Sequence, residues 1–181
     1  AITVLEELER DGGMLGAGLA WREAIPSAIR TLGDGDVQLS PGRLGAIEAA
    51  LDYDAQNGNL FAVVAFTDPT SLGWAVNMSP DGGHTWNETY WWIPAVGVLG
   101  VDGVVVGEYF YVGYRPGAND TVVRLRRFFV SDGTVDADYF FQTVIDAPFG
   151  VTVTGSCVAA NQDDFDNRIY VMAMLSNGTI M

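Results

Sequence analysis

The sequence predicts an all-β protein built from repeated antiparallel sheets, and three observations indicate this class. Short runs rich in Val, Tyr, Phe and Trp occupy the chain from about Ile47 onwards, and clusters of Gly, Pro, Asn and Asp separate them. Three of these runs look alike, because each has the pattern of a buried strand opened by a polar residue, at Asn59, Glu108 and Asn167. Their starts lie 49 and 59 residues apart, close to the roughly 40–50 residues of a four-stranded repeat.

Each repeat begins with an inner strand and a hairpin. In the first unit we expect strands at residues 47–54, 59–66, 72–78 and 89–94. The second unit repeats this order, with strands at residues 98–106, 108–115, 121–130 and 139–145. The third has strands at residues 151–160 and 167–174 and a short last strand at 175–181. The units then cover about 41–96, 97–146 and 147–181, and the last of them is incomplete.

The first forty residues differ from the rest of the chain. Residues 2–10 have the pattern of one short helix, which the Gly-rich residues 11–18 end. Residues 19–26 resemble an outer strand. We therefore expect an irregular N-terminal segment, residues 1–40, that contributes a docking strand to the repeat region, residues 41–181.

A turn between two strands is the most informative motif of the chain. It reads Ser79-Pro80-Asp81-Gly82-Gly83-His84-Thr85-Trp86. The two glycines supply the positive φ that a tight turn needs, and Asp81 can accept hydrogen bonds from the surrounding backbone. Trp86 offers a large apolar plug for the base of the hairpin. His84 is the only histidine of the chain, and we expect it to be a solvent-exposed turn residue.

This octet resembles the Asp-box of the sialidase-like BNR repeats, with matches at Ser79, Asp81, Gly83, Thr85 and Trp86. The resemblance implies β-propeller blades, each a four-stranded antiparallel sheet, with the Asp-box turns on the outer rim and away from the ligand-binding face. Residues 131–134 are a shortened copy of the octet, and residues 176–179 are better read as a hairpin turn. About two and a half blades are then present, fewer than the roughly four that a closed propeller needs.

Three explanations are compatible with this number of blades. The chain is part of a longer protein, or another chain completes the ring with the strand at residues 19–26 as a missing outer strand, or the repeats form an open sandwich. An open array leaves sheet faces uncovered. We therefore expect further blades of the same protein, or another subunit, as a partner.

The charge of the chain argues against two classes of partner. The formal net charge is −14, and all nine basic residues are Arg, which argues against nucleic acid and anionic membranes. No apolar run reaches the roughly 18 residues of a membrane span, and no signal peptide is recognisable. Asn-x-Ser/Thr sequons occur at Asn77, Asn87, Asn119 and Asn177. They fit a secreted glycoprotein, although the same residue types also gather in β-turns.

The family resemblance also implies candidate binding residues. Sialidases hold a substrate carboxylate with Arg residues from different blades, and the candidates here are Arg115, Arg124 and Arg168. The Arg-Ile-Pro motif of that family is absent, and no Glu stands where the family places its nucleophile partner, so we assign no catalytic residue. The aromatic outer strands are expected to pack between sheets.

The sequence offers little support for a cofactor. No cluster has zinc-ligand spacing, and the single Cys157 reads as a buried small hydrophobe. The acidic segments at residues 33–36 and 163–167 offer oxygen ligands to Ca²⁺ but lack EF-hand spacing, which favours solvated loops.

Together these features predict a noncatalytic recognition or structural module, outside the cell or on a particle surface, with a carbohydrate as candidate ligand. Two alternatives stay open. One is a part of a sialidase-like glycoside hydrolase. The other is a virion or other assembly component, in which the first forty residues dock the repeats onto a scaffold.

Overall fold

The computed structural model describes residue 39 and residues 46–68, 71–93, 97–117, 120–161 and 168–181. Within these ranges every regular element is a β-strand, which confirms the predicted all-β class. The strands form two four-stranded antiparallel sheets and one two-stranded hairpin. None of the sheets in this part of the chain closes on itself.

The two sheets are simple meanders. The first contains β1 (Ala46–Tyr53), β2 (Leu60–Asp68), β3 (Ser71–Ser79) and β4 (Asn87–Trp92). The second contains β5 (Val98–Val106), β6 (Tyr109–Pro116), β7 (Val122–Phe129) and β8 (Gln142–Asp146). In each sheet every strand pairs with the next one along the chain, so the first and last strands are the edges. The hairpin consists of β9 (Val153–Asn161) and β10 (Arg168–Leu175).

Two predicted strands differ from the observed ones. Residues 139–141 lie before β8 rather than in it, because oxygens of Asp136 accept hydrogen bonds from two backbone N–H groups that follow and form a turn there. Residues 175–181 do not form one strand either. A turn follows β10, and Ile180 then bridges back to Met174.

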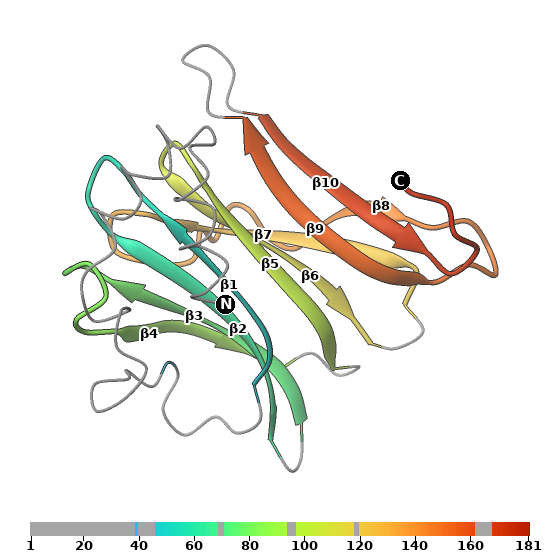
Figure 1. Cartoon of the computed structure of the whole chain (residues 1–181), viewed down its shortest axis with the longest axis horizontal. Coiled ribbons are helices and arrows are strands. Elements are labelled where there is room, and N and C mark those ends of the chain that lie inside the picture. Colours follow the sequence, from blue (N-terminus) through green and yellow to red (C-terminus); the bar gives the residue numbers. More distant parts are fainter. Residues whose placement is uncertain (1–38, 40–45, 69–70, 94–96, 118–119, 162–167) are drawn as a thin grey trace, which may run out of the picture.

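The second sheet lies between the first sheet and the hairpin (Figure 1). The main core fills the space between the two sheets, and its largest buried side chains are Phe61, Trp74, Phe110, Tyr114 and Phe128. A smaller cluster joins the second sheet to the hairpin and contains Val123, Ile145, Val153, Ala173 and Leu175. Because alternate residues of a strand point to opposite faces, the second sheet divides its side chains between these two cores.

The predicted packing of aromatic residues between sheets is observed in part, since Trp91 and Phe140 of the same segments are 52% and 65% exposed. Trp92 of β4 lies against Phe141, with ring centres 4.3 Å apart, and Tyr90 lies against Phe128 at 5.1 Å. Both pairs join the first sheet to the second. They pack the outer strand β4 of the first sheet against the second sheet.

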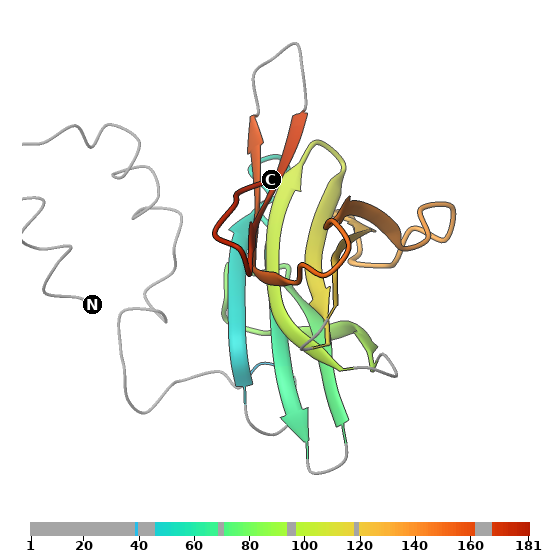
Figure 2. The same ribbon diagram turned by 90° about the vertical axis from the view of Figure 1, so that its right-hand side faces the viewer.

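The first strands of the three units, β1, β5 and β9, lie next to one another (Figures 1 and 2). Glycine permits part of this approach, because a Cβ atom at Gly100 of β5 would lie only 2.9 Å from Oε2 of Glu48 in β1. We call β1, β5 and β9 the inner strands. Their proximity brings side chains of one inner strand within reach of the backbone of the next.

Several predictions concern residues outside the described ranges. One is the N-terminal segment 1–40, of which only residue 39 is described, together with its docking strand at residues 19–26. The others are the acidic segments at 33–36 and 163–167 and the sequon at Asn119.

Candidate functional site

The octet closes the turn between β3 and β4 with its own side chains. Asp81 accepts hydrogen bonds from the backbone N–H of Thr85 (2.8 Å) and from its hydroxyl (2.7 Å). Ser79, which is fully buried, donates to Asp81 (2.8 Å) and accepts from the N–H of Gly83 (2.7 Å). The indole N–H of Trp86 donates to the carbonyl of Gly83 (3.1 Å). All five residues of the motif therefore stabilise the turn itself.

These hydrogen bonds also set the charge of the turn. The hydroxyl and the backbone N–H of Thr85 stabilise the ionised carboxylate and lower the pKa of Asp81 to about 2. Gly82 and Gly83 have φ angles of 70° and 97°, a conformation that L side chains rarely adopt. His84 is exposed, as predicted. The geometry is that of a structural turn.

Two other turns share part of this design. Asp132 accepts hydrogen bonds from the N–H (2.9 Å) and the hydroxyl (2.7 Å) of Thr134. The side chain of Asn177 accepts from the N–H of Thr179 (3.0 Å). The turn at Asp132 follows the third strand of its sheet, as the octet does, whereas the turn at Asn177 follows the second strand of its unit. Only the first of the two therefore occupies the position of the octet.

Three carboxylates on the inner strands form the most regular feature between the units. Each accepts a hydrogen bond from a backbone N–H of the next inner strand, and the pairs are Glu48 with Val101 (3.0 Å), Asp52 with Val105 (2.6 Å) and Asp102 with Val158 (2.8 Å). These three strands do not pair with one another through backbone hydrogen bonds. The carboxylates therefore accept hydrogen bonds from backbone N–H groups in place of the carbonyls of a paired strand.

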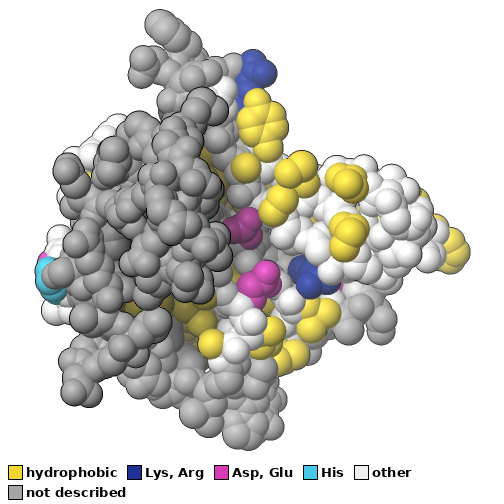
Figure 3. All heavy atoms as spheres, in the orientation of Figure 1, with side chains coloured by type: hydrophobic (Ala, Val, Ile, Leu, Met, Phe, Trp, Pro, Cys, Tyr) yellow, Lys and Arg dark blue, Asp and Glu magenta, His cyan; other side chains and the backbone are white. Residues whose placement is uncertain are grey.

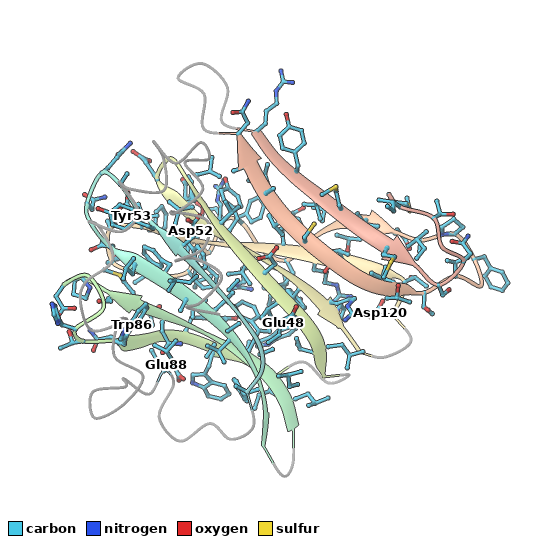
Figure 4. All side chains as sticks on the ribbon, in the orientation of Figure 1. Glu48, Asp52, Tyr53, Trp86, Glu88 and Asp120 are labelled. Atoms are coloured by element: carbon cyan, nitrogen blue, oxygen red, sulfur yellow. The ribbon has the colours of Figure 1, made fainter. Side chains whose placement is uncertain are left out.

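This arrangement can be followed in the figures. Figure 4 labels Glu48 and Asp52, which lie along β1. In Figure 3 acidic side chains gather near the middle of the same face, with a basic side chain beside them.

The surroundings of Asp52 perturb its pKa. Burial raises the pKa of Asp52; the N–H groups of Val105 and Tyr53 act against this, and the negative charge of Asp102 adds to it. Two facing carboxylates are the usual requirement for glycoside hydrolysis. Here, however, the second oxygen of each carboxylate accepts a hydrogen bond from the N–H of its own next residue, Tyr53 or Gly103, at 2.8 Å. Because the backbone engages both oxygens, the pair suits a structural link between sheets.

The structure separates the three arginines that the sequence analysis named as candidate ligand-binding residues. Arg115 of β6 donates to main-chain carbonyls of β5 (3.0 Å) and β9 (3.2 Å) and so joins the second sheet to the hairpin. Arg124 of β7 lies directly opposite Tyr114, whose ring packs against Trp74 of the first sheet. Arg124 therefore lies on the face of the second sheet that is turned toward the first sheet, the face opposite to that of Arg115. Arg168 is exposed at the start of β10.

Sequence analysis gave no role to Arg126 and Arg127, the next two arginines of β7. Arg127 forms an ion pair with Asp136 (2.7 Å) and lies between the rings of Tyr109 (4.1 Å) and Tyr139 (4.5 Å). Burial acts to lower the pKa of Arg127, but the hydrogen bond from its guanidinium to Asp136 contributes to a net rise. Arg126 points to the opposite face and is buried. The sequence did hold a signal for the position of Arg126, because the alternation of side chains along a strand places Arg124 and Arg126 on the same face.

The sequons differ in exposure. Asn77 is fully buried in β3, which leaves no room for a glycan in the folded chain. Asn87 and Asn177 are exposed. Cys157, expected to be buried, is a half-buried free thiol.

The described residues offer neither a metal site nor a membrane-spanning helix. They contain no group of His, Cys, Asp and Glu that could hold a metal ion. They also contain no helix long and apolar enough to cross a bilayer.

No protein-family model matches the sequence, and a search of curated proteins finds no match. The functional conclusion therefore rests on the geometry of the described residues.

Proposed function

We propose that this chain is a noncatalytic structural or recognition module, built as a segment of an Asp-box β-propeller that works outside the cell or on the surface of a particle. The repeated carboxylate link between inner strands is the observation that supports it most. The linked residues lie 53, 53 and 56 positions apart and make the same contact from one unit to the next. Such repetition is expected of blades arranged around one axis.

The hydrogen bonds of the polar groups support a noncatalytic role. A general acid or a nucleophile has to reach its substrate. Asp52 and Asp102 instead use both carboxylate oxygens for backbone N–H groups. Arg115 uses its guanidinium for main-chain carbonyls, and it lies on the face of the second sheet opposite to Arg124. A sialidase-like hydrolase would need such arginines to converge on one carboxylate, so we favour the noncatalytic role.

The hairpin supports assembly with further sheets. Tyr170, Met172 and Met174 alternate with residues that pack on the second sheet, and they are 48%, 48% and 53% exposed. Figure 3 shows hydrophobic side chains over this part of the face. A two-stranded hairpin with an apolar face is stabilised when another sheet covers it. We therefore propose that further blades of the same protein, or another subunit, cover the hairpin in a propeller or in a virion-type assembly.

Activity and binding assays on the 181-residue chain test the noncatalytic role. A fluorogenic sialoside and a panel of aryl glycosides, assayed from acidic to neutral pH, should show no turnover above the buffer rate. A glycan array then decides whether a carbohydrate is the recognised ligand. Turnover that is lost in Asp52→Asn or Asp102→Asn would overturn the proposal.

Assembly needs a separate measurement. Size-exclusion chromatography with light scattering should show association of the chain that Met172→Glu reduces, because this change places a charge on the apolar face of the hairpin. A monomer at every concentration would exclude a second copy as the covering partner.

A further inference from the structure

One buried cation of the second sheet lacks an acceptor for its Nε in the part of the chain that the structure describes. Arg126 is 7% exposed, and its Nε has no hydrogen-bond partner. Among the described residues no ion pair includes it, whereas Arg127, next to it in β7, is paired with Asp136. Buried charges in proteins are normally paired with an opposite charge or fully hydrogen-bonded. Arg126 departs from this rule.

Aromatic rings surround its guanidinium. The central carbon lies 4.2 Å from the ring centre of Phe141, 5.1 Å from that of Tyr90 and 5.4 Å from that of Phe140. Such cation–π contacts offset part of the cost of burying a charge. They do not supply acceptors for the N–H groups, which lie in the plane of the guanidinium.

Two further buried donors belong to the same cluster. The indole N–H of Trp74 and the hydroxyl of Tyr114 have no hydrogen-bond partner, and their rings lie 5.5 Å apart. The ring of Trp74 is also 5.3 Å from Tyr90, which contacts Arg126. Arg124 approaches the Tyr114 hydroxyl without reaching hydrogen-bond geometry. Burial raises the pKa of Tyr114 to about 12, so this hydroxyl keeps its proton and can donate it.

The cluster lies close to solvent. Phe140, one of the rings next to the guanidinium, is 65% exposed. It packs edge-on against Phe141, with ring centres 5.0 Å apart. Both residues precede β8, outside regular secondary structure. A ligand would therefore reach the N–H groups of Arg126 from the side of the exposed Phe140 ring.

The charge of the chain limits the ligands that fit. A formal net charge of −14 repels polyanions, so a ligand with a single negative group is favoured. A carboxylate matches the fork of a guanidinium, and flat apolar groups stack on aromatic rings. We propose that Arg126 is the anion-binding residue of a site, between β4 and β7, for a small aromatic carboxylate. The proposal concerns the interface of two described sheets and does not depend on the propeller arrangement.

Calorimetric titration of the full chain with benzoate tests this site, with benzamide as a neutral probe of nearly the same shape. We expect saturable binding of benzoate and none of benzamide, because only benzoate carries the charge that Arg126 would pair. Benzoate should also raise the melting temperature of the chain, since a ligand that binds only the folded state stabilises it.

Substitutions at two neighbouring arginines locate the site. Arg126→Gln should weaken benzoate binding at least about tenfold, the loss of one charge-assisted contact. Arg127→Gln is the matched control, because it removes the same charge from the same strand on the opposite face. It should leave benzoate binding unchanged. Arg126→Lys keeps the charge but not the fork and should bind benzoate with intermediate affinity.

Three results would overturn the proposal. They are absence of benzoate binding, equal binding of benzamide, and equal effects of Arg126→Gln and Arg127→Gln on the affinity. If Arg126→Gln does not fold, the comparison of benzoate with benzamide and the affinity of Arg126→Lys decide the question. A purely structural role predicts that Arg126→Lys retains the melting temperature and that benzoate does not change it.

Discussion

The carboxylate of Asp52 in β1 accepts a hydrogen bond of 2.6 Å from the backbone N–H of Val105 in β5. One side chain thereby joins two sheets whose backbones do not pair with each other. The same kind of link recurs at Glu48 and at Asp102. The relative position of the sheets therefore depends on polar contacts at the inner strands as well as on the apolar core between them.

Removal of this link should destabilise the chain. Asp52→Ala leaves the N–H of Val105, a residue that is 4% exposed, without this acceptor. We expect a loss of about 1–3 kcal/mol in the free energy of unfolding, the usual cost of a buried hydrogen bond that loses one partner. Urea denaturation measures it. Glu108→Ala, at an exposed position, is the control and should stay within about 0.5 kcal/mol of wild type. Equal effects of the two changes would contradict the structural role of Asp52.

The octet should make stability depend on acidic pH. In the unfolded chain Asp81 titrates near its ordinary pKa of 3.8, whereas Thr85 holds its pKa at about 2 in the folded turn. Between these values the unfolded chain binds a proton that the folded chain does not. The stabilisation is therefore fully present above about pH 4 and is lost as the pH falls toward 2.

Melting temperatures measured across this acid range check the prediction. Asp81→Asn should flatten the acid limb of the profile, because the folded and unfolded states then bind the same number of protons at this position. Part of the slope should remain, since Thr134 lowers the pKa of Asp132 in the same direction. Asp138→Asn removes an equal charge and serves as the control. A profile of Asp81→Asn that superimposes on that of wild type would refute the link.

Much of the architecture was predictable because it depends on local sequence. Strand alternation and turn residues located the four strands of each sheet to within a few positions. The turn at Asp81 was predictable because Ser79, Gly83 and Thr85 meet it within a few residues. Contacts such as that of Asp52 with Val105 were not, because they depend on the register between strands about fifty residues apart, which no local pattern encodes.

The roles of the arginines were harder to predict for a similar reason. Arg115 was named as a ligand-binding candidate, but its guanidinium donates to one main-chain carbonyl of β9, which packs against β6, and to another of the neighbouring strand β5. Arg126 was not among the ligand-binding candidates that the sequence suggested. Its surroundings depend on tertiary packing, because the rings next to it belong to β4 of the facing sheet and to the segment before β8 of its own sheet.

The buried hydroxyl of Ser79 should contribute much of the stability of the octet turn. Ser79→Ala removes the acceptor of the Gly83 N–H and the donor to Asp81 at a fully buried position. We expect a loss of about 1–3 kcal/mol by urea denaturation. Ser131→Ala is the matched control, because Ser131 opens the corresponding turn of the second sheet but is exposed. Similar losses in both variants would show that exposure does not decide the contribution of this hydroxyl.

The packing of the hairpin on the second sheet should depend on the absence of a side chain at Gly113. A Cβ atom there would overlap Cγ2 of Val158 in β9, so in Gly113→Ala either the Val158 side chain or the hairpin that carries it has to shift. Gly155 is a suitable comparison, since a Cβ atom at that position would lie 3.7 Å and 3.9 Å from atoms of Met174, an ordinary contact. We expect Gly113→Ala to cost about 1–3 kcal/mol, as overpacking does, and Gly155→Ala to change stability by less than about 0.5 kcal/mol.

Hydrogen exchange separates this effect from a general loss of stability. In Gly113→Ala the amides of β9 and β10 should exchange faster than in wild type, while those of β2 and β3 keep their relative protection, because the overlap affects only the contact between the second sheet and the hairpin. The N–H of Val158 is the most informative probe, since it donates to Asp102 of β5 across the same contact. Uniformly faster exchange in all three units would mean that the hairpin does not open independently of the two sheets. Unchanged exchange at Val158 would place Gly113 outside the contact that holds β9.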